Sequence, residues 1–289
     1  MKINNMYPVY FTFGALILYG VLYVLPCILG IGFAFTDWSS YSDQLHFVWL
    51  DNFKEVLSFQ ENYIKYLGNT LWFTFFTTIV KNIIGLALAI LLTKKVLMLN
   101  FHRAVMYVPA VLSALIAGMI FKSVLNPDTG MLNAFLNLFG INGPRWLSDP
   151  KIAFWSVMGV DIWKGMGYIM TIFIAGIMSI SPTYYEAADI DGAGAWQKFR
   201  AITLPMLMPA ITVTTVLNII YGLKVFDMVY ALTNGGPGNA TEVLYTSIYK
   251  EFGLGRYAIG TTLSSIMFIF MIIIGYFLIK MMTKSEVTE

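Results

Sequence analysis

Five charged side chains lie inside long apolar stretches of this sequence, where a charge is costly unless it faces water or meets an opposite charge. They are Lys81, Asp161, Lys164, Lys224 and Asp227. Asp161 and Lys164 are three residues apart, as are Lys224 and Asp227, so each pair is expected to meet on the surface of its own helix. A structural salt bridge is favoured for Lys224 and Asp227, which lie near the end of their stretch. For Asp161 and Lys164, a structural role and contact with a ligand stay equally open.

Polar and aromatic side chains accompany these charges and indicate what a polar path would hold. Asn218 and Tyr221 precede Lys224 and Asp227 at intervals of three residues, a ladder that drifts slowly around one helix. Ring faces, hydroxyls, amides and charges together hold a polyhydroxylated ligand such as a sugar, although each ring alone is more typical of packing or of the membrane interface. The candidate path residues are Lys81, Asp161, Trp163, Lys164, Tyr168, Asn218, Tyr221, Lys224 and Asp227.

The groups that covalent or hydrolytic catalysis requires are missing. His46 and His102 are the only histidines and Cys27 is the only cysteine, so no His/Cys metal cluster, Ser–His relay or disulfide is expected. No phosphate-binding loop with the Gly-x-x-x-x-Gly-Lys-Ser/Thr spacing occurs. An integral-membrane enzyme is therefore disfavoured, no cofactor or metal is expected on this chain, and a net charge of +2 without a basic stripe does not support nucleic acid binding.

Six apolar stretches carry these side chains, each long enough to cross the hydrocarbon core of a bilayer, which takes about 20 helical residues. The composition is 58% hydrophobic and 12% charged with a mean hydropathy of +0.70, more apolar surface than a soluble core buries. The first stretch is too long for a signal peptide and lacks a small-residue cleavage site, so it is expected to remain as a span. The sequence predicts an all-α integral membrane protein with one domain, 1–289, and spans at 10–35, 69–93, 104–124, 152–180, 206–231 and 257–280.

The orientation rests on a short basic turn. Lys94, Lys95 and Arg103 lie between the second and third stretches, and short loops rich in Lys and Arg stay in the cytoplasm. With six crossings, both termini and the loop 181–205 are then cytoplasmic. The expected outer loops are 36–68, 125–151 and 232–256.

The loop 181–205 has the signals of two short helices. Ser181 is expected to cap the first of them, and Gly192 can adopt the left-handed conformation that ends a helix. Helical spacing resumes over 195–202, and Pro205 is expected to stop this second helix before the fifth span. The two helices are predicted to lie at an angle on the membrane surface.

The order Glu186-Ala187-Ala188, Gly192 and Ile202-Thr203-Leu204-Pro205 resembles the EAA loop of permease subunits of binding-protein-dependent ABC importers. That resemblance implies the type I ABC importer permease fold. In that family the loop contains the coupling helix, which inserts into a cleft of the ATPase subunit, and a Glu at this place offers a charge with which a basic ATPase residue can pair. The alternative, an ordinary solvated connection, does not explain the joint spacing between the fourth and fifth of six spans. The residues to which the resemblance assigns coupling are Glu186, Ala187, Ala188, Asp189, Gly192, Ala193, Ile202, Leu204 and Pro205.

Shorter pieces narrow the resemblance to carbohydrate-uptake permeases of the maltose and glycerol-phosphate type. They are Phe35-Thr36-Asp37-Trp38, Leu50-Asp51-Asn52-Phe53, Asn69-Thr70-Leu71, Arg103 with Pro109, Gly130 with Asn133, Asp149-Pro150 and Leu232-Thr233-Asn234-Gly235-Gly236-Pro237. The resemblance implies a sugar or oligosaccharide substrate, an extracytoplasmic substrate-binding protein, a second related permease subunit and two ATPase subunits. The ATPase subunits would bind the ATP and Mg. The assembled importer would lie in the bacterial cytoplasmic membrane.

Two alternatives stay open at this point. A homodimer would replace the related partner permease. An ion-gradient-driven secondary transporter, to which Asp161 and Asp227 would contribute, belongs to a different class of protein and leaves the loop pattern unexplained.

Overall fold

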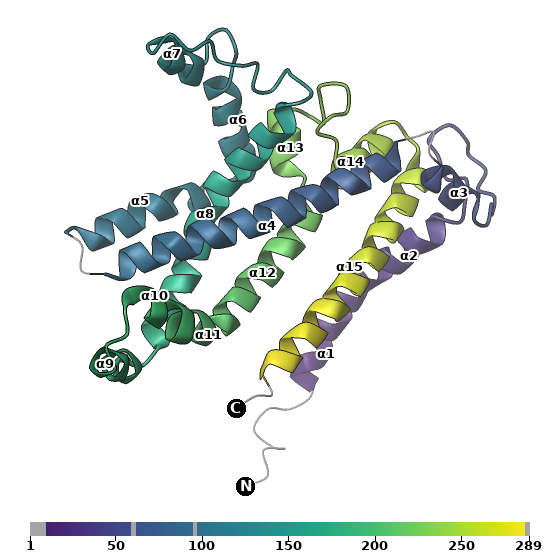
Figure 1. Cartoon of the computed structure of the whole chain (residues 1–289). Coiled ribbons are helices and arrows are strands. Elements are labelled where there is room, and N and C mark those ends of the chain that lie inside the picture. Colours follow the sequence, from purple (N-terminus) through teal and green to yellow (C-terminus); the bar gives the residue numbers. More distant parts are fainter. Residues whose placement is uncertain (1–9, 59–61, 95–96, 287–289) are drawn as a thin grey trace. The chain divides into compact units, whose positions relative to one another are not determined.

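The computed structural model describes residues 10–58, 62–94 and 97–286, and side chains within 12–278 and at Lys280; in this part the chain is built from helices (Figure 1). An isolated bridge between Thr36 and Phe47 is the β pairing found among these residues. The predicted all-helical architecture is confirmed. Lys95 of the predicted basic turn lies outside the described residues.

The helices follow one another through the whole chain. In order they are α1 Tyr10–Tyr19, η2 Gly20–Val24, α2 Leu25–Phe33, α3 Asp51–Leu57, α4 Tyr63–Thr93, α5 Leu99–Val111, α6 Ala114–Val124, α7 Met131–Asn137, α8 Ala153–Ser179, α9 Pro182–Ile190, α10 Ala195–Lys198, η3 Phe199–Thr203, α11 Leu204–Met206, α12 Met208–Leu223, α13 Asp227–Leu232, α14 Leu244–Gly253 and α15 Tyr257–Glu286. The single-domain interpretation of 1–289 stays a prediction. The structure is described below as the two compact units into which its contacts divide, Met1–Ile64 with Ser247–Ile273 and Lys65–Thr246 with Ile274–Glu289.

Within the part of the chain that the structure describes, four helices are long and apolar enough to cross a bilayer individually, namely Thr12–Phe33, Tyr63–Thr93, Ala153–Ser179 and Tyr257–Leu278. Two further candidates are bent pairs of helices. Leu99–Val111 and Ala114–Val124 meet at 98°, and Ala195–Met206 and Met208–Leu223 meet at 63°. Counting each bent pair as one crossing brings the number to six.

The predicted span 104–124 is not a continuous helix. α5 ends at Val111 and α6 begins at Ala114, with Leu112 and Ser113 in extended conformation between them. Pro109 lies in the last turn of α5 and cannot donate a backbone hydrogen bond, which weakens the helix there. Ser113 then caps α6, since its Oγ accepts from the amide of Ile116 at 3.3 Å.

The predicted span 206–231 is also interrupted. α12 ends at Leu223, and α13 begins only at Asp227. The amide of Lys224 donates to Tyr221 and that of Val225 donates to Gly222, at 3.1 and 3.2 Å. These bonds reach back three residues instead of four and tighten the last turn, which ends the helix.

In the first unit, buried hydrogen bonds connect α3 and α15 to the end of α2 and to the loop that follows it. Asn52 Nδ2 donates to the carbonyls of Ala34 and Thr36 at 2.8 and 2.7 Å. The Oγ1 of Thr262, in the part of α15 that belongs to this unit, donates to Ala34 at 3.2 Å. In the same loop, the carboxylate of Asp37 is hydrogen-bonded to the backbone amide and to the ring of His46. These bonds, above all the one from the backbone amide, hold the pKa of Asp37 below its usual value.

The second unit is organised around α8, which contacts α5, α6, α12 and α13. Small residues allow the closest approaches of these helices. A Cβ on Gly167 would lie 2.0 Å from the backbone oxygen of Met106 in α5, and one on Gly85 of α4 would lie 2.7 Å from Cγ2 of Ile169. The spacing of α8 from its neighbours therefore depends on these two glycines.

We expect Gly167→Ala to destabilise the protein by about 1–3 kcal/mol, because the added methyl group forces apart two helix backbones. Gly159→Ala in the same helix is the matched control, since nothing lies within 4 Å of its Cβ position; alanine there should stabilise the helix by about 0.5–1 kcal/mol. Thermal unfolding of both variants in detergent measures the difference. Equal melting temperatures would contradict the close packing of α5 on α8.

Candidate functional site

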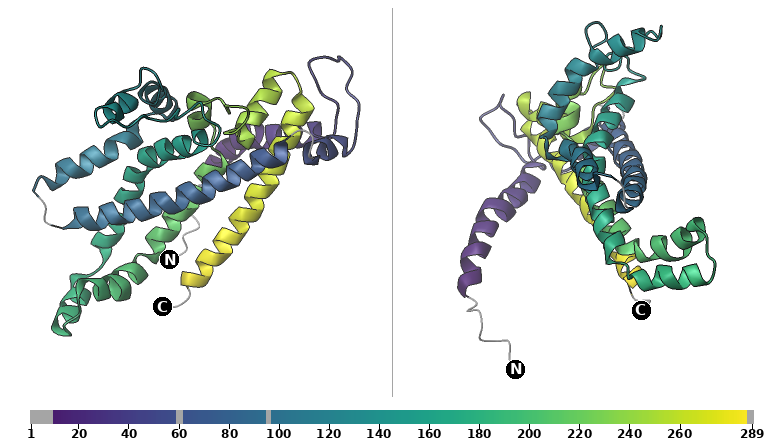
Figure 2. Two further views of the ribbon diagram at one scale, coloured as in Figure 1. Left: turned by 45° about the horizontal axis from the view of Figure 1, so that its top comes forward. Right: turned by 90° about the vertical axis from the view of Figure 1, so that its left-hand side faces the viewer.

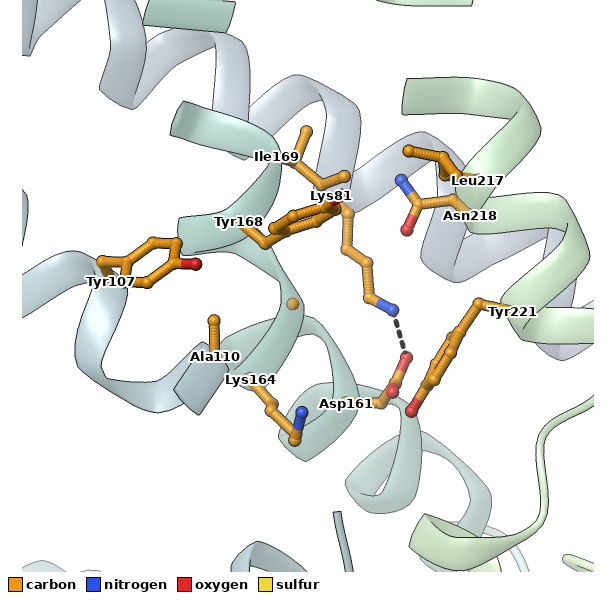
Figure 3. Close-up of a pocket in the computed structure, with 11 residues that line it drawn as sticks. Lys81, Tyr107, Ala110, Asp161, Lys164, Tyr168, Ile169, Leu217, Asn218 and Tyr221 are labelled. Atoms are coloured by element: carbon orange, nitrogen blue, oxygen red, sulfur yellow. Dashed lines mark ion pairs between the residues drawn. The ribbon is translucent and has the colours of Figure 1, made fainter. Parts of the chain in front are cut away.

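Three helices of the second unit, α4, α8 and α12, enclose a cavity of about 300 Å³ together with one side of α5 (Figure 3). Six of the nine predicted path residues line it. They are Lys81, Asp161, Lys164, Tyr168, Asn218 and Tyr221. The sequence pattern therefore identified most of the polar wall of one cavity, although its members come from three separate helices.

A buried ion pair crosses the cavity wall from α4 to α8. Lys81 Nζ lies 2.6 Å from Asp161 Oδ2, and the two side chains are 3% and 1% exposed. The ammonium also lies 4.8 Å from the ring centre of Tyr221, a favourable cation–π distance. Gly165 makes room for the lysine stem, since a Cβ there would lie 2.8 Å from Lys81 Cε.

This geometry corrects the predicted pairing of Asp161 with Lys164. Asp161 on α8 pairs with Lys81 of α4, as the dashed line in Figure 3 marks, and no ion pair joins it to Lys164 among the described residues. Position i+3 lies about 60° away around a helix, so a carboxylate turned inward is met more easily by a side chain from the facing helix. Because the Asp161 carboxylate is buried, it needs a cation that reaches the same buried position, and Lys81 does so.

Two lining groups have no partner among the described residues. Lys164 is half-buried and lies within 4.0 Å of no acidic oxygen in the described chain, so the cavity carries one cation that is not neutralised. Asn218 Nδ2 on α12 is buried and has no acceptor there. A buried donor without an acceptor is costly, and hydroxyl oxygens of a ligand would satisfy both groups.

Three predicted path residues lie elsewhere. Trp163 packs on Phe121 of α6, with ring centres 4.8 Å apart, and faces an apolar groove. Lys224 follows the last residue of α12 and Asp227 is the first residue of α13, so the predicted ladder along one helix is wrong beyond Tyr221. The predicted Lys224–Asp227 ion pair is absent among the described residues, because the break between the helices separates them.

The sequence reasoning missed Tyr107 and Ala110, which line the cavity from α5. Tyr107 lies two residues before Pro109 and Ala110 directly after it, within the predicted span 104–124. A proline inside an apolar stretch is a signal for a kink or break, and breaks in membrane helices frequently accompany cavities. Pro109, considered together with the nearby polar ring of Tyr107, therefore indicates that this part of α5 lines a cavity.

The loop between α8 and α12 projects beyond the ends of both helices (Figure 2). α9 covers Pro182–Ile190, and Gly192 after it has φ +73°, so the predicted left-handed end of the first helix is confirmed. The predicted cap is wrong, because the Oγ of Ser181 lies 2.8 Å from Thr183 Oγ1 and accepts from no backbone amide.

The second half of the loop is helical over α10, η3 and α11, which confirms the predicted helix over 195–202. It does not stop at Pro205, which lies in the first turn of α11; the bend of 63° comes at Leu207 instead. Proline is tolerated in a first turn, and the wider turn of η3 before it accommodates a residue that cannot donate.

Two contacts tie the halves of the loop together. Lys198 forms an ion pair with Asp189, and the hydroxyl of Tyr185 lies 3.0 Å from Thr203 Oγ1. Glu186 and Ala187 are exposed on α9, and Ile190 at its end is 88% exposed. The loop therefore exposes a carboxylate and apolar side chains, while the two contacts hold its halves together.

The sequence of this chain matches a known family over most of its length. Residues 81–285 match the family described as binding-protein-dependent transport system inner membrane component. This chain belongs to that family. The predicted resemblance is confirmed, and the chain is a multi-pass inner-membrane permease subunit of the ABC importer type, a transport component and not an enzyme.

Relatives match this chain over about three quarters of its length or more. The permease is 32% identical over 268 residues to AmyD of Thermoanaerobacterium thermosulfurigenes, a probable starch degradation products transport system permease protein, covering 92% of this chain and 90% of that one. It is 31% identical over 286 residues to MsmF of Streptococcus mutans, a multiple sugar-binding transport system permease protein, covering 99% and 98%. Trehalose/maltose transport system permease protein MalF of Thermococcus litoralis is 33% identical over 223 residues, covering 77% and 75%.

Solved structures share the fold. A chain of a bacterial ABC transporter involved in the import of the acidic polysaccharide alginate superposes with a TM-score of 0.85 at 25% identity, covering 97% of this permease and 96% of that chain. A second structure, of a bacterial alginate ABC transporter in complex with an alginate pentasaccharide-bound periplasmic protein, gives a TM-score of 0.81 with 93% and 92% coverage. The predicted type I importer permease fold is thereby confirmed.

Proposed function

We propose that this permease carries a sugar or oligosaccharide across the bacterial cytoplasmic membrane as half of an ATP-driven importer. The observation that carries the proposal is the cavity between α4, α8 and α12, whose wall combines tyrosine rings with the free ammonium of Lys164 and the free amide of Asn218. Rings contact the C–H faces of sugars, and the polar groups bond their hydroxyls. The curated relatives named for starch products, multiple sugars and trehalose/maltose support the same substrate class.

The partners in this proposal are a related second permease, two ATPase subunits that bind ATP and Mg, and an extracytoplasmic binding protein. The solved complex with a saccharide-bound periplasmic protein supports the last of these. Both termini and the loop 181–205 lie in the cytoplasm. Lys94, directly after α4, and Arg103, within α5, support this orientation, since short basic segments between spans remain inside.

The coupling mechanism follows from chain continuity. α9 begins three residues after the end of α8, and α10 to α11 lead directly into α12. α8 carries Asp161, Lys164 and Tyr168 into the cavity, and α12 carries Asn218 and Tyr221. When ATP binding closes the ATPase pair on α9, the braced loop moves as one piece and pulls both helices of the cavity wall. The helices then rotate between inward-facing and outward-facing forms.

Glu186, Ala187, Ala188, Asp189, Gly192, Ala193, Ile202, Leu204 and Pro205 are the residues of this coupling surface. Glu186 is placed to pair with a basic ATPase side chain, and Asp189 braces α9 through Lys198. A docked binding protein must also favour the outward form, because a ligand shifts an equilibrium only by its differential affinity for the two states.

Uptake by the reconstituted importer tests the proposal. We expect Lys164→Gln to lower the apparent affinity for the transported saccharide about tenfold, the loss of roughly one charge-assisted hydrogen bond. Lys122→Gln on α6 removes an exposed lysine outside the cavity and should leave uptake unchanged. Uptake that persists without ATP and collapses with an uncoupler would instead identify an ion-gradient-driven transporter.

A further inference from the structure

A second and larger cavity lies where the coupling loop meets the spans. It measures about 610 Å³ and is separate from the substrate cavity, sharing none of its lining residues. Its walls come from the ends of α4 and α8 and from both halves of the loop. The residues that matter for the argument are Ile90, Lys94, Ile177, Trp196, Lys198 and Phe199.

The floor and the rim of this groove differ in chemistry. Ile90, Ile177 and Phe199 give it an apolar floor, while Lys94 and Lys198 place two ammonium groups on its border. Lys198 is paired with Asp189, whereas exposed Lys94 has no acidic oxygen within 4.0 Å among the residues that the structure describes. An occupant therefore needs an apolar part and an anionic part.

The position of the groove fixes the kind of molecule that meets both needs. Lys94 directly follows Thr93, the last residue of the bilayer-length helix α4, so the cationic rim lies at the polar end of a span. Trp196 is 71% exposed beside it and packs on Phe199 with ring centres 5.4 Å apart. Exposed tryptophan at the end of a span is typical of the headgroup level of a bilayer.

We propose that this groove binds an anionic phospholipid, with its phosphate at Lys94 and an acyl chain along Ile90, Ile177 and Phe199. A free phosphate would leave the apolar floor uncovered, and a zwitterionic lipid would leave the ammonium without a net countercharge. A lipid in this position touches α4, α8 and the loop residues Tyr185, Trp196 and Phe199 at once. It thereby links the coupling loop to the bilayer, in addition to the helix connections described above.

Quenching of tryptophan fluorescence by brominated lipid tests the proposal without any need for transport. The permease, with the subunits that copurify, is placed in phosphatidylcholine bilayers that contain either brominated phosphatidylglycerol or brominated phosphatidylcholine. We expect stronger quenching by the phosphatidylglycerol, and Trp196→Phe should remove the excess. Lys94→Gln should weaken the apparent affinity for phosphatidylglycerol about fivefold, as for loss of one basic group at a membrane surface.

Arg200→Gln is the matched control, because it removes an exposed positive charge of the same helical segment that does not line the groove. It should change the affinity less than twofold. Equal quenching by the two lipids, or equal effects of the Lys94 and Arg200 variants, would overturn the proposal. Displacement of the lipid by millimolar inorganic phosphate would show a free-phosphate site and overturn it equally.

Discussion

Replacing Lys81 by Met, or Asp161 by Leu, is expected to destabilise the permease by roughly 3–5 kcal/mol, and the double replacement to recover most of that loss. The two groups are 2.6 Å apart, and neither side chain is more than 3% exposed. Removing one partner leaves a charge that is buried without its counterion. Removing both leaves an apolar contact between α4 and α8 of similar volume.

Thermal unfolding of the detergent-solubilised protein, followed by size-exclusion chromatography, measures the three variants. Lys54→Met is the control, because its ion pair with Asp51 has a similar length of 2.8 Å but side chains that are 76% and 69% exposed. Such an exposed pair contributes little, so its melting temperature should not change. A single Lys81 or Asp161 variant as stable as the parent would show that the pair is not a structural fastener.

The same series separates structure from transport. If the ion pair only fastens α4 to α8, the double variant should fold and also carry saccharide. If the pair also shapes the wall of the substrate cavity, the double variant should fold and fail in uptake. The cation–π contact of Lys81 with Tyr221 lies in the same wall, and we expect the second result, because loss of the ammonium also frees a cavity-lining ring.

Combining Glu186→Arg with Gly192→Pro should lower ATP-driven uptake at least thirtyfold while the protein still inserts into the membrane. The charge reversal replaces an attraction at the proposed ATPase contact by a repulsion, which costs about 2 kcal/mol or more at a close charge pair. Gly192 has φ +73°, whereas proline requires φ near −65°. The turn after α9 would therefore have to rearrange.

Uptake, the abundance of the protein in the membrane fraction and copurification of the ATPase are measured together. Gly194→Ala is the control, because Gly194 has φ −69° and only one atom, Gln197 Oε1 at 3.8 Å, near its Cβ position. That variant should behave as the parent. Full uptake by the double variant would remove the loop from the coupling mechanism.

The sequence by itself determined the features that depend on local chemistry. The length of the apolar stretches predicts an all-helical membrane protein, and the structure confirms this. The left-handed turn at Gly192 was predictable because only glycine reaches positive φ without steric cost. The residue spacing around Glu186 also predicted the family. This motif lies within one short loop, so it can be recognised without knowing which distant residues contact it.

Only the tertiary structure decided how the helices are rotated and where they break. A sequence shows that Asp161 and Lys164 are three residues apart, but it does not show which side of α8 faces α4. In the structure, the side of α8 that carries Asp161 faces α4, so Asp161 pairs with Lys81. Close approaches of helices at Gly85 and Gly167 set this rotation, through contacts between residues far apart in the chain. Side-chain partners across a cavity are long-range properties of packing, whereas helix formation and turn conformation are encoded within a few neighbouring residues.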